Sequence, residues 1–172
     1  MVNLQFNPVT SLIRFRMQTA PGNTKSYTVK KIKLTLDNAN ISGEVMLFPQ
    51  NDPYPASGPA QWPLVSVATD AAAHSVTVDF ESSLWLNNGF TQYCYAVVVP
   101  TNDIPTESTM TFVAYDENGQ PVLSTTKILP KRGSGTDTRY GFRPGMMYTL
   151  DLQLDEFTAE AVAGKYNIYD WE

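Results

Sequence analysis

Cysteine and histidine are almost missing from this chain of 172 residues, which holds one of each. A single cysteine excludes an intrachain disulfide framework and a cysteine-based zinc site. Cys94 lies within an apolar run, so we expect a buried, inert thiol rather than a catalytic thiolate. His74 is the only histidine that could act as the base of a catalytic triad, and no G-x-S-x-G motif supplies its nucleophile. We expect His74 to be an exposed residue at the start of a strand.

Charge is also scarce, and neither sign dominates strongly. Charged residues make up 17% of the chain, against about 25% in a typical soluble domain. The 12 Lys and Arg face 17 Asp and Glu, giving a net charge of −5, which disfavours a protein that tracks nucleic-acid phosphates. The carboxylates are scattered, and the sequence pairs no two of them across a cleft as glycoside hydrolysis requires. We therefore expect a protein that is not an enzyme, with no catalytic residues, no metal and no cofactor.

Long apolar runs and helical periodicity are missing too. The longest apolar run, residues 93–99, is far shorter than the roughly 20 residues of a membrane-spanning helix. No window of helical length shows a convincing apolar stripe. The first residues lack the basic and apolar regions of a signal peptide. Two alternatives follow: a cytosolic protein, or a piece of a longer chain whose export signal lies elsewhere.

The pattern that is present has a period of two. In residues 11–18, Ile13, Phe15 and Met17 alternate with Arg14 and Arg16, as in a half-buried antiparallel strand. Similar strand-like patterns occur in residues 29–36, 41–48, 75–80, 109–115, 121–129, 146–154 and 165–171. The run at 93–99 is apolar without interruption, which predicts a central strand buried on both faces.

Turn signals separate these segments. Asn118-Gly119 predicts a hairpin with a type I′ turn between residues 109–115 and 121–129, because both residues tolerate a positive φ. Pro144-Gly145 predicts a second turn, in which glycine supplies the positive φ. About nine to ten short strands predict an all-β, antiparallel sandwich that forms one domain over residues 1–172. Periodicity alone leaves a closed barrel open as the alternative.

Aromatic residues offer one candidate ligand site. Tyr54, Trp62 and Trp85 lie in expected loops or at the ends of elements, where exposed rings could stack on sugars. The alternative is that these rings cap the core and keep only a polar edge in water.

Six segments, taken in order, carry a resemblance to a known family: VNLQFNPVTSLIRF at 2–15, YTVKKIKL at 27–34, ISG at 41–43, YAVVVP at 95–100, FRPGMMYTL at 142–150 and YNIYDW at 166–171. They resemble the fimbrillin-like, or Mfa-like, surface proteins of anaerobic Gram-negative gut and oral bacteria. The resemblance implies the C-terminal, transthyretin-like Greek-key sandwich of a longer exported outer-membrane lipoprotein. It also implies a pilus or adhesion subunit at the cell surface, which binds other pilus subunits or surface ligands. A carbohydrate-binding module of a surface glycan system is the alternative function.

The resemblance further implies assembly by strand complementation, in which an extended segment of one subunit completes another. Residues 165–171 are the candidate donor or closing strand. Tyr166 and Ile168 would lie on one of its faces, and Tyr169 and Trp171 on the other. The alternative, that this strand pairs within its own domain, is open at this point.

Deletion of residues 165–172 separates the two alternatives. If the strand closes its own domain, the melting temperature of the monomer falls, because buried strand contacts are lost. If the strand is donated, the monomer melts as before and polymerisation is lost. Calorimetry and sedimentation of the two chains measure both quantities.

Overall fold

The computed structural model describes residues 10–45, 65–66, 74–91, 93–105, 108–128, 139–142 and 144–158. These residues form strands and turns and include no helix, so the predicted all-β class is confirmed. The eleven strands are β1 (Ser11–Thr19), β2 (Tyr27–Leu36), β3 (Glu44–Val45), β4 (Val65–Ser66), β5 (Ser75–Leu86), β6 (Cys94–Val98), β7 (Thr101–Pro105), β8 (Thr109–Tyr115), β9 (Pro121–Ile128), β10 (Arg139–Phe142) and β11 (Met147–Glu156). No described segment could cross a lipid bilayer as a helix.

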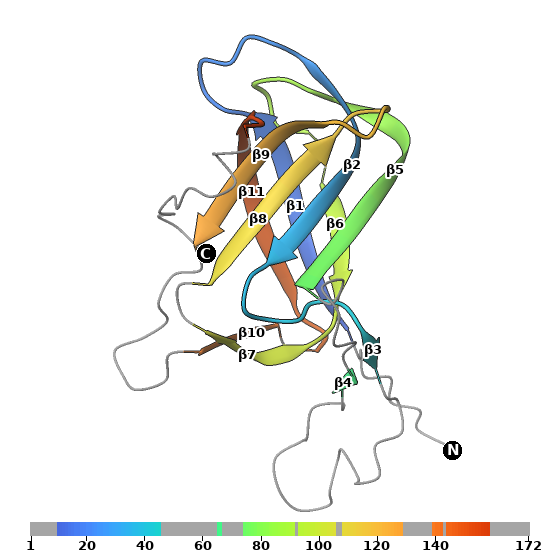
Figure 1. The fold of residues 1–172 in the computed structure, drawn as a ribbon, viewed down its shortest axis with the longest axis vertical. Helices are drawn as coiled ribbons and strands as arrows, with labels where there is room; N and C mark the ends of the chain where they lie inside the picture. Colours follow the sequence, from blue (N-terminus) through green and yellow to red (C-terminus); the bar gives the residue numbers. More distant parts are fainter. Residues whose placement is uncertain are drawn as a thin grey trace, which may run out of the picture.

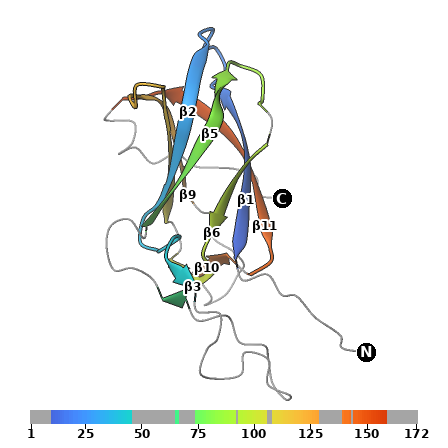
Figure 2. The same ribbon diagram turned by 90° about the vertical axis from the view of Figure 1, so that its right-hand side faces the viewer.

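Seven strands form one sheet in the order β5-β2-β8-β9-β11-β1-β6. In Figure 1, β9, β8, β2 and β5 lie in front of β11, β1 and β6, so the sheet curls around a common interior. Figure 2 shows the two end strands, β5 and β6, on the same side of the molecule. The sheet is therefore nearly closed into a barrel, and the predicted sandwich is wrong. The alternating pattern requires only one buried face, which a strongly curved sheet provides as well as two stacked sheets do.

The pairing of β1 with β11 is parallel, whereas the other neighbours in the main sheet are antiparallel. Its register runs from Leu12 opposite Met147 to Thr19 opposite Leu154. The sheet is thus mixed, and the expected all-antiparallel arrangement is wrong for this pair. Alternation along a strand specifies which side chains are buried, but not which neighbour the strand chooses or in which direction.

The core is formed by the inward side chains of this curved sheet, together with Ile41 before β3 and Ile104 of β7. Phe15 of β1 and Phe112 of β8 are fully buried, and their ring centroids lie 5.9 Å apart. Other fully buried side chains include Ile13, Met17, Ile32, Leu34, Leu36, Ile41, Leu86, Ile104, Met110 and Leu123. The alternation that predicted a half-buried strand at residues 11–18 is confirmed, since Ile13, Phe15 and Met17 face inward.

The apolar run at residues 93–99 does not form a central strand. β6 is the last strand of the sheet order, and its residues alternate between buried and exposed. Tyr95 and Val97 are 49% and 58% exposed, whereas Ala96 is buried. The prediction failed because the outward positions of this edge strand carry apolar side chains instead of polar ones.

The two predicted turns are present, one with a different geometry. The Asp116 N–H donates to the Gln120 carbonyl at 2.9 Å, and the Gly119 N–H donates to the Asp116 carbonyl at 3.1 Å. Gly119 has a φ of 75°, whereas Asn118 does not have a positive φ. The connection is therefore a three-residue loop that ends in a glycine bulge, rather than a type I′ turn. In the second turn Gly145 has the expected positive φ, 74°.

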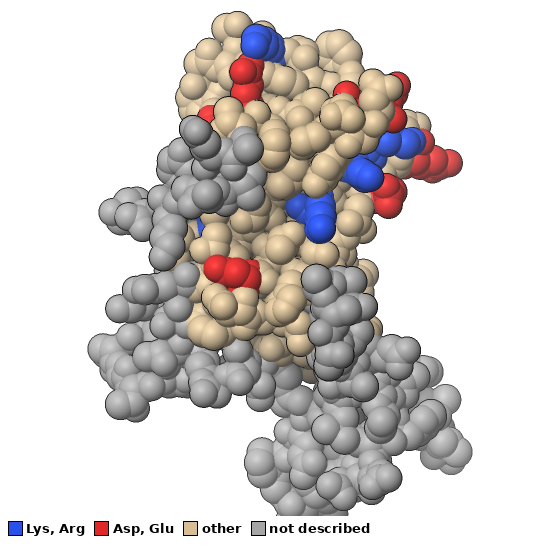
Figure 3. Space-filling view, viewed as in Figure 1, with Lys and Arg blue, Asp and Glu red and all other residues tan. Residues whose placement is uncertain are grey.

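Charges on the face seen in Figure 3 are mixed. Basic and acidic groups lie side by side at the edge of this face where β2 and β5 run. In the register of these strands, Lys31 of β2 is opposite Asp79 of β5. This face therefore presents neighbouring charges of opposite sign rather than a stripe of one sign.

Truncation of a core ring measures the dependence of the fold on this interior. We expect Phe112→Ala to lower the free energy of unfolding by about 3–5 kcal/mol, because a fully buried ring leaves a cavity. Val97→Ala, at an exposed position, should change it by less than about 0.5 kcal/mol. Urea denaturation measures both changes, and equal losses for the two variants would contradict the placement of the core.

Candidate functional site

Of the ligand-stacking and donor-strand residues that the sequence singled out, the structure describes one, Trp85. Trp85 in β5 is 67% exposed, so its ring is accessible rather than capping the core. The other candidate residues lie outside the described residues: Tyr54, Trp62, Tyr166, Ile168, Tyr169 and Trp171.

The structure places the single histidine and the single cysteine, His74 and Cys94, away from full exposure. His74 is half-buried rather than exposed, and its Nδ1 lies 2.8 Å from the Ala39 carbonyl oxygen, to which it donates. Cys94 is buried as predicted, and burial raises the pKa of its thiol, which opposes thiolate formation. Within the described ranges, no three His, Cys, Asp or Glu residues cluster as metal ligands would.

One outward surface combines charge, aromatic rings and an open strand. We call it the β6 face and define it by residues of β6, β1, β11 and the segment before β6: Phe90, Tyr93, Tyr95, Val97, Arg14, Arg16, Thr149 and Asp151. The registers align these strands, with Tyr95 opposite Arg14 and Arg14 opposite Thr149. One row along the strand, Arg16 is opposite Asp151.

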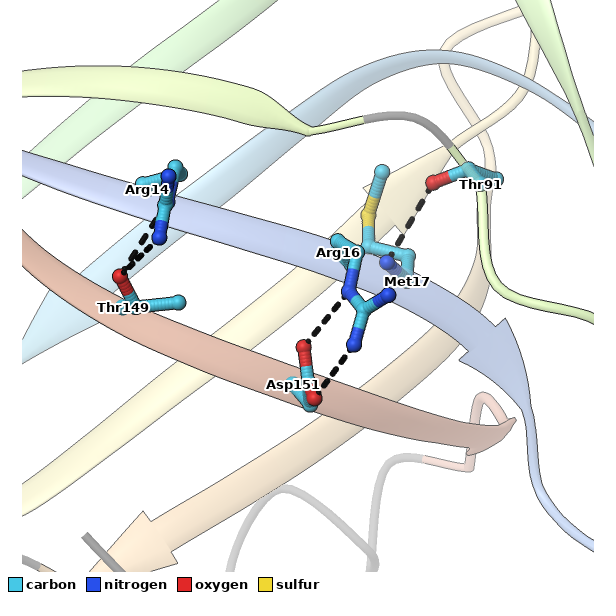
Figure 4. A network of polar contacts seen from close by, with 6 residues as sticks. All are labelled: Arg14, Arg16, Met17, Thr91, Thr149 and Asp151. Carbon is cyan, nitrogen blue, oxygen red and sulfur yellow. Dashed lines mark hydrogen bonds and ion pairs between the residues drawn. The ribbon is translucent and has the colours of Figure 1, made fainter. Parts of the chain in front are cut away.

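Arg16 and Asp151 form a two-pronged ion pair across β1 and β11. Arg16 Nε donates to Asp151 Oδ1 at 2.9 Å, and Nη2 donates to Oδ2 at 2.8 Å, as Figure 4 shows. These hydrogen bonds, together with the charges of Arg16 and Arg14, hold the pKa of Asp151 below its ordinary value of 3.8. The charge of Arg16 is therefore already neutralised within the sheet.

Arg14 lies two residues before Arg16 on the same face of β1, but it has a different partner on β11. Its Nε and Nη2 donate to Thr149 Oγ1 at 3.2 and 3.0 Å, and Figure 4 shows both bonds converging on one hydroxyl oxygen. Its guanidinium carbon lies 4.4 Å from the ring centroid of Tyr93. Among the residues that the structure describes, no carboxylate pairs with Arg14. The hydrogen bonds and the ring contact of Arg14 are thus with neutral groups.

On the side of β6 that faces away from β1, none of the described strands pairs with its backbone. The Val99 N–H donates to the Ile41 carbonyl at 2.9 Å, and the N–H groups of a strand point in the same direction at every second residue. The N–H and C=O groups of Tyr95 and Val97 therefore also point away from β1. No described residue forms a backbone hydrogen bond with them. An unpaired row of this kind is a template for another strand.

Sequence reasoning missed this surface because it placed residues 93–99 in the core. One signal in the sequence could have revealed it. Two residues with large amphipathic rings, Tyr93 and Tyr95, alternate with two small buried residues, Cys94 and Ala96. Tyrosine combines an apolar ring with a polar hydroxyl group, which suits it to interfaces.

Comparison of the chain with protein-family models, curated proteins and solved structures finds no match. The resemblance to fimbrillin-like proteins therefore depends on the sequence motifs alone.

The Arg16–Asp151 pair makes a small, pH-dependent contribution to stability. The side chains are 30% and 46% exposed, so we expect less than about 1 kcal/mol from the pair. Because the folded pKa of Asp151 is lowered, this contribution is complete above pH 3.8 and is lost as the pH falls through the folded value. Denaturation of the wild-type chain and Asp151→Asn across this range measures it. A difference that persists at the acidic end would contradict the ion pair as its source.

Proposed function

We propose that this chain is a non-enzymatic, cell-surface subunit of a pilus or adhesive fibre, to which an extended segment of another subunit adds at β6. The observation that carries the proposal is the open edge of β6, where the backbone groups of Tyr95 and Val97 point away from β1 without a described partner. Strand addition uses such groups directly, because backbone hydrogen bonds provide affinity and alternate side chains provide specificity.

The side chains of β6 itself do not oppose pairing at its edge. Natural sheets protect exposed edges with charged side chains, prolines or bulges. β6 contains no charged residue and no proline, and its pairing with β1 runs from Ser11 opposite Val98 to Phe15 opposite Cys94 without a shift. Its exposed side chains are the ring of Tyr95 and the aliphatic Val97. An edge that attracts other strands fits a subunit that is meant to associate.

The remaining parts of the proposal come from the resemblance to fimbrillin-like proteins. It supplies the surface location, the outer-membrane lipoprotein of which this chain would be the C-terminal part, and the pilus role. We also propose that the candidate donor strand, residues 165–171 of a neighbouring subunit, adds at the β6 edge, with Tyr166, Ile168, Tyr169 and Trp171 as anchors. An alternating apolar segment is the kind of strand that such an edge accepts.

The alternative, a carbohydrate-binding module, has less support. Trp85 is exposed, as a sugar-stacking ring must be. However, its two expected companions, Tyr54 and Trp62, lie outside the described residues. One accessible ring is a weaker basis than a strand edge with both its backbone groups and its side chains open.

Substitution of Val97 tests strand addition without removing the ladder between β6 and β1. Val97→Pro eliminates an outward N–H that is not bonded to β1. Val97→Lys places a charge on the edge, which opposes pairing. We expect both variants to lose concentration-dependent association of the full chain, as measured by sedimentation velocity, while melting close to the wild-type temperature.

Gln153→Lys is the matched control, because Gln153 is an exposed residue of β11, which has strand neighbours on both sides. It should associate like the wild-type chain. Association that survives both Val97 substitutions would disprove addition at β6, whereas equal loss in the control would indicate a general effect of added charge.

A further inference from the structure

The large apolar side chains that remain exposed are concentrated on one face of the molecule. Among the described residues seven such side chains are exposed, and the β6 face holds four of them: Phe90, Tyr93, Tyr95 and Val97. Met147 of β11 is a fifth beside it, because Leu12 of β1 lies between Val97 and Met147 in the register. Apolar residues that gather in this way, rather than being scattered singly, mark an interaction surface.

The composition and the shape of the β6 face suit a protein partner. Tyr, Phe, Met and Arg are enriched at protein interfaces, whereas Lys and Glu are depleted, and the residues that define this face include neither Lys nor Glu. The sheet curls around its interior (Figure 1), so its outer face is convex. Small ligands are usually held in concave pockets. A broad complementary surface therefore fits this face better than a small molecule does.

Arg14 supplies a fixed positive charge within this face. Its Nε and Nη2 donate to Thr149 Oγ1, which turns the guanidinium towards β11 (Figure 4), and its guanidinium carbon lies 4.4 Å from the ring centroid of Tyr93. No described group accepts a hydrogen bond from its Nη1. Asp151 neutralises Arg16 but is not paired with Arg14. A carboxylate that approaches the outer face of the sheet from solvent would find both the charge and free N–H donors.

The charge of the β6 face has the opposite sign to that of the rest of the chain. Arg14, Arg16 and Asp151 give the face a net charge of +1. Subtracting this from the net charge of the chain, −5, leaves −6 for all other residues. Two copies would therefore repel each other face to face, whereas the β6 face of one copy attracts the remaining surface of another. Charge complementarity thus favours a head-to-tail contact between copies.

We propose that the β6 face docks the body of a neighbouring copy of this chain, whose acidic surface brings a carboxylate to Arg14. The inference rests on the proposed function, because a subunit whose strand adds at the edge of β6 has its body beside the β6 face. One copy contributes the β6 face and the next contributes a different surface. Such a heterologous contact leaves one surface unused at each end, so it can repeat along an open fibre.

Reversal of the charge at Arg14 tests the head-to-tail contact in the full chain. Arg14→Glu sets a carboxylate against the acidic surface of the neighbour, and we expect self-association to weaken about tenfold. The variant keeps its own acidic surface, so it should still bind the β6 face of the wild-type chain and then accept the next copy poorly. Added to the wild-type chain, it should therefore shorten the assemblies in proportion to its amount. Sedimentation velocity measures both effects, and shortening also shows that the variant is folded.

Lys33→Glu is the matched control, because it makes the same change of charge on β2, which pairs with β5 and β8 rather than with β6. It should associate within about twofold of the wild type and join wild-type assemblies without shortening them. Normal association of Arg14→Glu, its failure to shorten wild-type assemblies, or an equal loss in the control would overturn docking at the β6 face. Addition at β6 would then still stand if the Val97 variants are defective. A wild-type chain that stays monomeric would overturn both proposals.

Discussion

The alternation of β1 is the constraint on which the rest of the structure depends. Its inward residues, Ile13, Phe15 and Met17, are buried in the barrel, while Arg14 and Arg16 face outward between β11 and β6. If the register of β1 shifted by one residue, Arg14 and Arg16 would turn into the interior and Phe15 would turn towards solvent. Because β1 has neighbours on both sides, this single strand fixes the interior, the parallel contact with β11 and the arrangement of the β6 face together.

A single curved sheet also explains why an edge is left over. Two stacked sheets would have four edges and a fully closed barrel none, whereas this sheet ends at β5 and β6. At β6 the outward positions are apolar or aromatic and the backbone groups of Tyr95 and Val97 have no described partner. The proposed addition of a strand from another chain would account for this apolar composition.

The sequence predicted local structure better than arrangement. The period of two in residues 11–18, the turn glycines and the burial of Cys94 follow from local rules, and all three are confirmed. The prediction of a sandwich was wrong because the alternation of apolar and polar residues specifies neither the curvature of a sheet nor which strand pairs with β1 in parallel. The site was missed for a related reason: an apolar run such as YCYAVVV reads as core until the structure shows that one of its faces has no neighbour. The distinction between Arg14 and Arg16 required the register, since only pairing with β11 places Thr149 beside one and Asp151 beside the other.

Hydrogen exchange followed residue by residue at the backbone amides of Tyr95 and Val97 tests strand addition at β6 most directly. In the dilute monomer the amides of Tyr95 and Val97 should exchange rapidly, while that of Ala96, which points towards β1, should be protected. On association, Tyr95 and Val97 should become protected as a new strand takes up their N–H groups. Protection of these two amides already in the monomer, or rapid exchange in both states, would contradict an open edge that functions by strand addition.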